Sequence, residues 1–323
     1  MEKFNQTTVK YFIITGISES PILQAPIFLL VLLLYLVTLG GNMIIVLLIC
    51  LDHHLHTPMY YFLCNLSVLD FCCSTVTLHR ILSTFVTGER AISYLTCIAH
   101  MYFFGSFICD ELLFLTAMSY DRYVAICNPL RYTQVMNGGV CLLLSIVCWI
   151  LGFLEMIPFI VLISRFTCYK SNIINHFFCD TVEVFKLSCS DTSIFNIVLV
   201  TEGLILLCLL PFLLKCISYV FIISTIMKIR SNFGRRKAFY TCSSHITVVI
   251  LLYATLCYQY QRPSTTDGLD YNKLFSLFNT AALPILNPMI YSFKNKDVKS
   301  AFRRQCKYLI THAACNWHLS FKV

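Results

Sequence analysis

Seven long apolar runs dominate this chain, and each of them is long enough to cross a lipid bilayer as a helix. A membrane-spanning helix needs about 20 predominantly apolar residues. Short polar stretches separate the runs and leave no room for a second domain. We therefore predict an all-α membrane protein, a single domain (residues 1–323) built as a bundle of seven transmembrane helices. The predicted spans are residues 26–50, 58–82, 98–122, 139–163, 196–228, 239–260 and 271–292.

The composition agrees with a chain whose main solvent is lipid. Hydrophobic residues make up 58% of the chain and charged residues only 12%, against about 25% charged residues in a typical soluble domain. The formal net charge of +8 does not indicate a nucleic-acid partner, because the basic residues lie in loops and form no basic stripe interleaved with aromatic residues. The lipid bilayer is the expected partner.

The basic residues also predict which side of the membrane each end occupies. Lys and Arg are enriched in cytoplasmic loops, and a modest majority lies on the side of residues 228–237 and 293–323. Residues 1–25 then form an extracellular leader, residues 26–292 the helix bundle, and residues 293–323 a cytoplasmic helix and tail. The sequon at Asn5 agrees, because N-glycosylation is lumenal, and Asn5 is the expected glycosylated residue. We expect a multi-pass protein of the plasma membrane.

A short amphipathic helix is predicted directly after the seventh span. Val298, Ala301 and Phe302 follow helical spacing, with Lys299 and Arg303 between them. Such a pattern is typical of a helix that lies on the membrane surface.

Motifs of enzymes are missing from the sequence. It holds no H-E-x-x-H, P-loop or G-x-S-x-G pattern, so we predict no enzymatic activity. His53, His54 and His56 are close together, but no Cys or further His completes a set of metal ligands. We interpret them as plain loop histidines.

Ionisable residues inside the spans are costly in lipid, and each is therefore a functional hypothesis. Glu202 either turns inward, where it favours a cation, or faces the lipid headgroups. Lys215 either faces a polar cavity or reaches the inner surface by snorkelling. The other main cases are Asp70, Glu111, and Asp121 beside Arg122.

The third span ends in the run Met118–Tyr132, which contains Asp121-Arg122-Tyr123. This run resembles rhodopsin-like G-protein-coupled receptors, and specifically the olfactory (odorant) receptors. Further passages fit the same family, in order along the chain. They are Gly41-Asn42, Leu55–Leu63 (LHTPMYYFL), Ser218-Tyr219, Lys237–His245 (KAFYTCSSH) and Pro284–Tyr291 (PILNPMIY).

The resemblance implies a receptor that binds an odorant and activates a stimulatory, olfactory-type G protein to raise cyclic AMP. An Arg beside an Asp can be held by an ion pair at rest and released when the helices part. Pro288 removes a backbone donor and loosens the seventh helix, while Asn287 can satisfy the freed groups. The residues expected in switching and G-protein coupling are Asp121, Arg122, Tyr123, Tyr219, Asn287, Pro288 and Tyr291.

The resemblance also implies two disulfides and an internal sodium ion, with no other cofactor. The disulfides are Cys97 with Cys179 and Cys168 with Cys189, although four cysteines allow three connectivities. The sodium site would use Asp70 and Glu111, with Asn42 and Asn287 nearby. The alternative is a protonated, hydrogen-bonded pair of carboxyl groups, because two close carboxylates cannot both ionise alone.

In this family a small molecule binds between the outer halves of helices three, five, six and seven. The expected lining is mostly apolar, which suits a small, lightly polar organic ligand, and it holds no basic residue to pair with a carboxylate. Helix packing is the alternative role for each of these residues. They are Phe104, Gly105, Ile108, Cys109, Gly203, Leu207, Tyr253, Leu256, Cys257, Tyr260, Leu277 and Thr280.

Two other functions remain open at this point. One is a receptor of the same class for a non-odorant metabolite or peptide. The other is a transporter or channel, which needs a continuous polar path or duplicated halves, and no internal repeat is apparent in the sequence.

Overall fold

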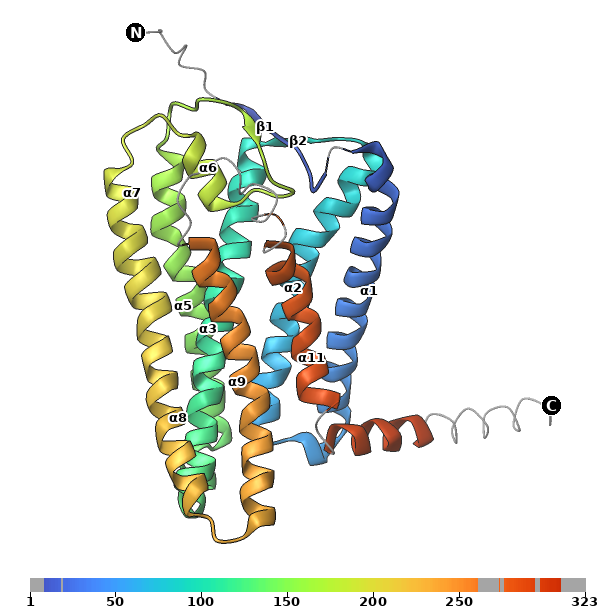
Figure 1. The fold of residues 1–323 in the computed structure, drawn as a ribbon, viewed down its shortest axis with the longest axis vertical. Helices are drawn as coiled ribbons and strands as arrows, with labels where there is room; N and C mark the ends of the chain where they lie inside the picture. The colour runs from blue at the N-terminus through green and yellow to red at the C-terminus, as the bar shows by residue number, and fades with distance from the viewer. Residues whose placement is uncertain (1–8, 19, 261–272, 274–275, 294–296, 309–323) are drawn as a thin grey trace, which may run out of the picture.

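The computed structural model describes residues 9–18, 20–260, 273, 276–293 and 297–308. Its long helices stand side by side as one bundle (Figure 1). Six of them, within this described part, are long and apolar enough to cross a membrane. They are α1 (Pro21–Leu51), α2 (Pro58–Thr87), α3 (Tyr94–Cys127), α5 (Gly138–Ser164), the continuous segment Ser193–Lys228, and α9 (Asn232–Tyr260).

The seventh helix covers residues 276–293 and consists mainly of a π-helical turn, η5 (Phe278–Ala282), and α11 (Leu283–Phe293). Helix α11 packs against α1, α2 and α9. The predicted seven-helix bundle is therefore confirmed. The first part of the predicted seventh span, up to residue 275, lies almost entirely outside the described residues.

The fifth span changes its geometry along its length. It begins as α7 (Ser193–Val198), continues as a π-helix, η3 (Leu199–Leu209), and ends as α8 (Leu210–Lys228). Pro211 lies at the start of α8, where its missing N–H removes a helix hydrogen bond. The wider winding ends where the proline fixes the backbone.

Capping residues set the helix boundaries where the polar loops begin. Ser93 accepts a hydrogen bond from the backbone N–H of Thr96 and starts α3. Asn137 starts α5 in the same way. Gly88 ends α2 with a positive φ of 70°, which glycine adopts without a steric penalty. Helix α1 begins at Pro21, inside the predicted leader, because proline is favoured in the first turn.

A small sheet at one end of the bundle was not predicted. Strand β1 (Tyr11–Ile14) pairs antiparallel with β2 (Ala91–Ser93) and parallel with β3 (Ile173–Ile174). Phe12 and Ile14 of β1 are buried beneath it. Strands this short, without a clear alternation of apolar and polar residues, give little signal in a sequence. The all-α prediction therefore holds for the spans but not for the segments at this end.

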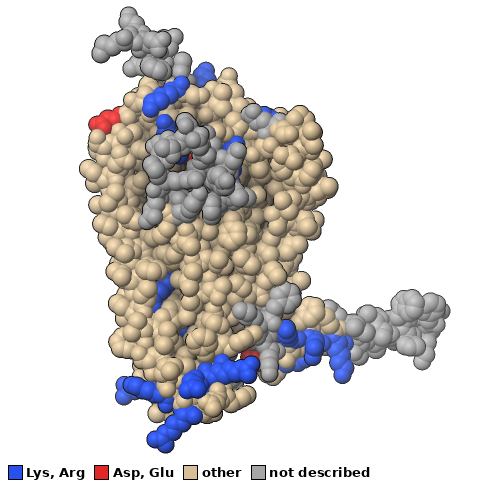
Figure 2. Space-filling model, in the orientation of Figure 1, with Lys and Arg blue, Asp and Glu red and all other residues tan. Residues whose placement is uncertain are grey.

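The opposite end carries the short connections and a helix at residues 297–308, which points away from the bundle (Figure 1). Val298 and Ala301 of this helix are buried, whereas Lys299 and Arg303 are exposed, as the predicted amphipathic pattern requires. Figure 2 shows Lys and Arg side chains gathered around this end and along the helix. The short elements here are η1 (His53–Leu55), η2 (Pro129–Arg131) and α4 (Tyr132–Val135).

Helix α3 is the central element of the packing. It contacts α2, α5, α8 and α9, and its Phe114 and Leu115 are fully buried. In contrast, large apolar side chains on α1 and on Ser193–Lys228 are exposed, as in Leu33 and Val220. An outer surface of this kind is stable only where lipid covers it.

Candidate functional site

We call the end of the bundle with helix 297–308 its inner end and the end with the sheet its outer end. Arg122 is held in place at the inner end, near the C-terminus of α3. Arg122 Nε donates to Asp121 Oδ2 at 2.8 Å, and the two side chains form an ion pair. The hydroxyl of Tyr132, from α4, donates to the other carboxylate oxygen, Asp121 Oδ1, at 2.8 Å. Burial and the neighbouring Asp121 raise the pKa of Tyr132, so its hydroxyl remains a donor. Because Asp121 is completely buried, this pair is shielded from water.

Tyr219 and His245 form a second polar contact at this end. The hydroxyl of Tyr219, on α8, is hydrogen-bonded to Nδ1 of His245, on α9. Nε2 of His245 has no hydrogen-bond partner among the described residues. In the sequence His245 stands out only as part of the motif Lys237–His245; its pairing with Tyr219 gives it a role in joining the two helices. Tyr123 packs its ring against Phe221 of α8 at 6.0 Å.

The structure brings the two carboxylates of the bundle core together through one amide. Asn287 Nδ2 donates to Asp70 Oδ2 at 3.0 Å and lies 3.3 Å from Glu111 Oε1. Asp70 and Glu111 are 1% and 4% exposed. Two buried carboxyl groups at one amide cannot both be ionised without a cation.

Buried oxygen atoms without partners among the described residues are found on the helices that hold this pair and on the neighbouring α1. The side-chain oxygens Asn287 Oδ1, Asn42 Oδ1 and Ser74 Oγ are buried and lack hydrogen-bond partners within the described residues. Buried polar atoms are normally satisfied. Carboxylate, amide and hydroxyl oxygens are the donors that hard ions prefer, and the buried thiol of Cys73 also lies close enough to interact electrostatically with both carboxyl groups.

The proline in α11 has a partner in α1 that compensates for it. A helix would place the N–H of residue 288 on the carbonyl of Pro284, but Pro288 has no N–H. Asn42 Nδ2 donates to that carbonyl instead, at 3.0 Å. A Cβ at Gly41 would lie 3.6 Å from the Pro288 ring, so α1 and α11 come close here. The side chain of Tyr291 lies outside what the structure describes.

The residues expected at the ligand site are not all in the same environment. Phe104 meets Phe178 of the outer loop, with ring centroids 4.9 Å apart. Gly105 instead faces Met156 on α5, and Gly203 lies against Phe159 of the same helix. Cys109, Leu207, Tyr253, Leu256 and Thr280 are buried, Ile108 and Leu277 are half-buried, Cys257 is exposed, and the side chain of Tyr260 is outside the described residues.

The long loop between α5 and α7, which we call the lid, covers the outer end and is held by disulfides. Cys97 at the start of α3 is bonded to Cys179, and Cys168 to Cys189, as predicted. His176 is buried in the lid and accepts a hydrogen bond from the backbone N–H of Phe178 at 3.4 Å. Burial, together with the positive charges of Lys273 and Lys186, lowers its pKa to about 3. The ring is therefore neutral.

Two buried ionisable side chains add features that the expected site lacked. Lys215 Nζ lies 3.1 Å from the hydroxyl of Tyr253, so a basic group adjoins the expected ligand site after all. Asp110, which the sequence analysis overlooked, is fully buried between α3 and α5, and neither carboxylate oxygen has a hydrogen-bond partner within the described residues. Both residues lie inside apolar runs of the sequence, where an ionisable side chain is itself an indication of a functional position.

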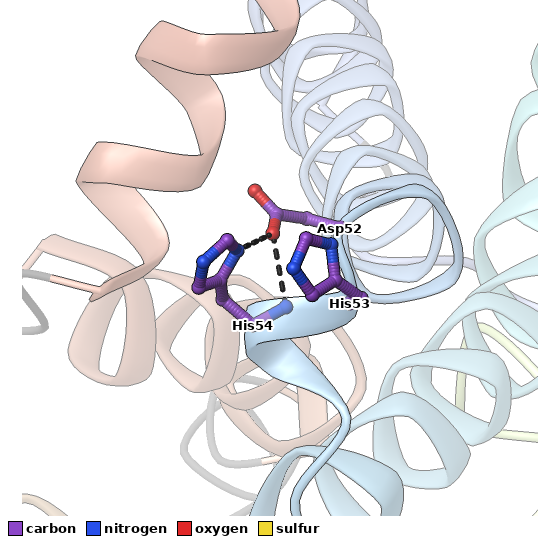
Figure 3. Close-up of side chains that lie close together, drawn as sticks. All are labelled: Asp52, His53 and His54. Atoms are coloured by element: carbon purple, nitrogen blue, oxygen red, sulfur yellow. Dashed lines mark hydrogen bonds and ion pairs between the residues drawn. The ribbon is translucent and has the colours of Figure 1, made fainter.

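Two of the loop histidines, His53 and His54, form a cluster with Asp52 (Figure 3). Asp52 Oδ1 accepts from His54 Nδ1 at 3.0 Å, and Oδ2 accepts from Arg304 Nε at 2.9 Å. Ligand atoms of Asp52, His53 and His54 lie within 4.8 Å of one another, but both carboxylate oxygens are already engaged. Burial would raise the pKa of Asp52, but these contacts outweigh it and lower the pKa to about 2. The cluster ties the loop to helix 297–308.

Comparisons with known proteins agree on one family. A family model described as "Olfactory receptor" matches residues 31–307. Mouse "Olfactory receptor 8G17" is 45% identical over 304 residues, which is 94% of this chain and 99% of the relative. Mouse "Olfactory receptor 5G9" is 46% identical over 93% of this chain and 95% of its own length. Human "Olfactory receptor 8D1" is 42% identical over 93% of this chain and 97% of its own length.

Proposed function

This chain belongs to the olfactory receptor family and is an odorant receptor of the membrane, and on that premise we propose how it signals. A small, mostly apolar odorant binds between the outer halves of α3, α8, α9 and the helix at residues 276–293. Binding activates a stimulatory, olfactory-type G protein and raises cyclic AMP. The family consists of receptors, so the protein is not an enzyme.

The observation that carries this proposal is the held state of Arg122. Its guanidinium is paired with Asp121, and Asp121 is in turn held by Tyr132. Tyr219 is occupied by His245 rather than by Arg122. An odorant needs only to bind the open arrangement of the helices better than this one to shift the population. Arg122 then becomes available to the G protein.

The test is a cyclic AMP assay with a chemically diverse odorant panel. We expect at least one odorant to raise cyclic AMP in cells that express the receptor, and Arg122→Ala to abolish that response at equal surface expression. Arg165→Ala, which removes an exposed arginine at the outer end of α5, is the matched control and should respond normally. An undiminished response of Arg122→Ala would contradict the coupling role.

We further propose that Asp70 and Glu111, with Asn42 and Asn287, hold a sodium ion that favours the resting state. The buried oxygens without partners support this. Replacing sodium by a large organic cation should raise basal cyclic AMP in the parent receptor but not in Asp70→Asn. Basal activity that ignores sodium in both proteins would contradict the proposal.

We propose that the sheet end is extracellular and the end with helix 297–308 cytoplasmic. Disulfides form in oxidising, lumenal compartments, and both lie at the sheet end. Basic residues gather at the other end (Figure 2). Asn5, the proposed glycosylation site, lies outside the described residues; a shift in mobility after glycosidase treatment, lost in Asn5→Gln, would test it.

A further inference from the structure

Lys215 occupies an unusual place for a lysine. It lies in the first third of α8, and its side chain is 1% exposed. Its ammonium turns into the bundle, where Nζ donates to the backbone carbonyl of Leu112 on α3 at 3.0 Å and to the hydroxyl of Tyr253 on α9 at 3.1 Å. The ammonium also lies 5.0 Å from the centre of the Tyr253 ring. A lysine in a span usually extends to the membrane surface instead.

Within the part of the chain that the structure describes, no carboxylate forms an ion pair with Lys215. Glu111, an acidic side chain of α3, is engaged by Asn287. Backbone carbonyls, phenols and aromatic faces moderate a buried positive charge but do not neutralise it, and an unpaired buried charge costs several kcal/mol. The Lys215 ammonium therefore lacks a counter-ion, which one bound anion would supply.

The direction of the side chain shows where that anion would come from. Side chains on a helix lean toward its N-terminus. The N-terminal end of α8 continues into η3 and α7, which run to the sheet end of the bundle (Figure 1). Lys215 thus reaches toward the outer half, and its partner Tyr253 is one of the residues expected at the ligand site. Phe212 packs against the same tyrosine ring at 4.9 Å.

We propose that Lys215 determines ligand specificity by pairing with the carboxylate of an acidic odorant that has an apolar tail. The carboxylate accepts hydrogen bonds from the Lys215 ammonium and the Tyr253 hydroxyl at the floor of the ligand site. The tail lies among the apolar side chains above, such as Leu207 and Leu256. This inference rests on the proposed function, because it names the chemical class of the ligand for the same site.

The experiment compares three matched series of probes: straight-chain monocarboxylic acids, their methyl esters and the primary alcohols of equal length. Cyclic AMP is measured for the wild-type receptor, Lys215→Met and Cys216→Ala, with surface staining of each. Methionine keeps the length of the lysine stem without its charge. Cys216 is the exposed neighbour on α8, so Cys216→Ala is the matched control.

We expect the best acid to be at least about tenfold more potent than its own ester on the wild-type receptor, because charge-assisted hydrogen bonds are lost in the ester. Lys215→Met should lose this preference and respond to acid and ester alike, whereas Cys216→Ala should keep it. The comparison of acid with ester on the wild type needs no variant, so it decides the question even if Lys215→Met does not reach the surface.

Two results would overturn the inference. One is a wild-type receptor that prefers esters or alcohols to acids, which would leave the odorant-receptor proposal intact. The other is Lys215→Met that reaches the surface and keeps the acid preference. A failure of the proposed function looks different, because Arg122→Ala would then signal as well as the wild type with whichever odorant is active.

Discussion

The two ends of the bundle are held together by different kinds of interaction. At the inner end and in the core, polar side chains join the helices: Tyr132 of α4 with Asp121 of α3, Tyr219 with His245, and Asn287 with the two core carboxylates. At the outer end, two disulfides, a three-stranded sheet and aromatic packing join the elements. The inner contacts are single hydrogen bonds and ion pairs, whereas the outer ones include covalent bonds, a sheet and apolar packing.

This difference suits a receptor in which binding and signalling take place at opposite ends. Hydrogen bonds and ion pairs can be exchanged for others at little net cost, because each contributes only about 0.5–3 kcal/mol. A disulfide cannot be exchanged on the time scale of signalling. In the proposed mechanism, the outer end serves as a fixed frame around the ligand, and the inner end is the part that changes.

The largest expected effect tests the frame. Cys97→Ser breaks the bond that ties α3 to the outer loop, and we expect a loss of about 2–5 kcal/mol of stability and little receptor at the cell surface. Surface staining against total expression measures this. Cys50→Ser, which removes an exposed free cysteine of α1, is the control and should be expressed normally.

The second disulfide allows a comparison of how strongly each bond supports surface expression. Cys168–Cys189 closes a segment of 21 residues, whereas Cys97–Cys179 spans 82. The entropy removed from the unfolded chain grows with loop length, so Cys168→Ser should reduce surface expression less than Cys97→Ser. The reverse order would show that chain entropy does not explain how the outer end is held.

The next effect tests the inner end. Asp121→Asn keeps the size of the side chain but removes the charge that holds Arg122, and a hydrogen bond to a charged group contributes about 1.5–3 kcal/mol. Because the proposed mechanism assigns this contact to the resting state, its loss should raise basal cyclic AMP several-fold per receptor at the surface.

An exposed acid of the outer loop provides the control for this substitution. Asp191→Asn makes the same chemical change at a residue that lies far from α4 in the chain and outside the spans, and it should leave basal signalling unchanged. Equal basal activity of Asp121→Asn and the wild type would mean that the Arg122 pair does not restrain the receptor.

The sequence predicted the inner end better than the outer end, for a physical reason. Its motifs are short and local, and they indicate their chemistry without any knowledge of the packing: Asp121-Arg122-Tyr123 and the passage around Asn287 and Pro288. The sequence led us to expect that Asn287 satisfies the group that Pro288 frees. Asn42 does so instead, through a contact with the carbonyl of Pro284 that joins residues 242 positions apart.

The outer end depends on long-range placement that local patterns do not encode. The sheet joins residues near 12, 92 and 173, and each strand is too short to alternate clearly. Gly105 was placed at the ligand site by counting along α3, but the side of the helix on which it lies faces Met156. Lys215 and Asp110 were visible as charges in apolar runs, yet their partners depend on how the helices pack.

A close helix contact in the middle of the bundle provides the third test. A Cβ at Gly152 of α5 would overlap the carboxyl group of Asp110 and lie 2.9 Å from its backbone nitrogen. Gly152→Ala should therefore destabilise the receptor by about 1–3 kcal/mol through overpacking, as a lower thermal midpoint of purified protein. Gly40→Ala is the control, since nothing lies within 4 Å of its added Cβ.

A double variant identifies the cause of that loss. If the carboxyl group of Asp110 is what the methyl group meets, Asp110→Ala combined with Gly152→Ala should be more stable than the sum of the two single changes predicts. Additive losses would place the strain in the backbone of α3 instead, because the Asp110 nitrogen remains in both proteins.

The smallest expected effect concerns the inner surface. Arg304 pairs with Asp52 but is 44% exposed, and exposed ion pairs contribute about 0–1 kcal/mol. Arg304→Gln should lower the thermal midpoint only slightly, and Arg303→Gln, its exposed neighbour, less still.

The pKa of Asp52 falls from 3.8 to about 2 on folding, so its stabilising contribution is complete above about pH 3.8 and is lost only as the pH falls toward 2. The difference between Arg304→Gln and the wild type should consequently be the same at pH 7 and pH 5. A difference that disappears at pH 5 would mean that Arg304 does not hold Asp52. The loop at Asp52 would then be joined to helix 297–308 less firmly than Arg122 is joined to Asp121.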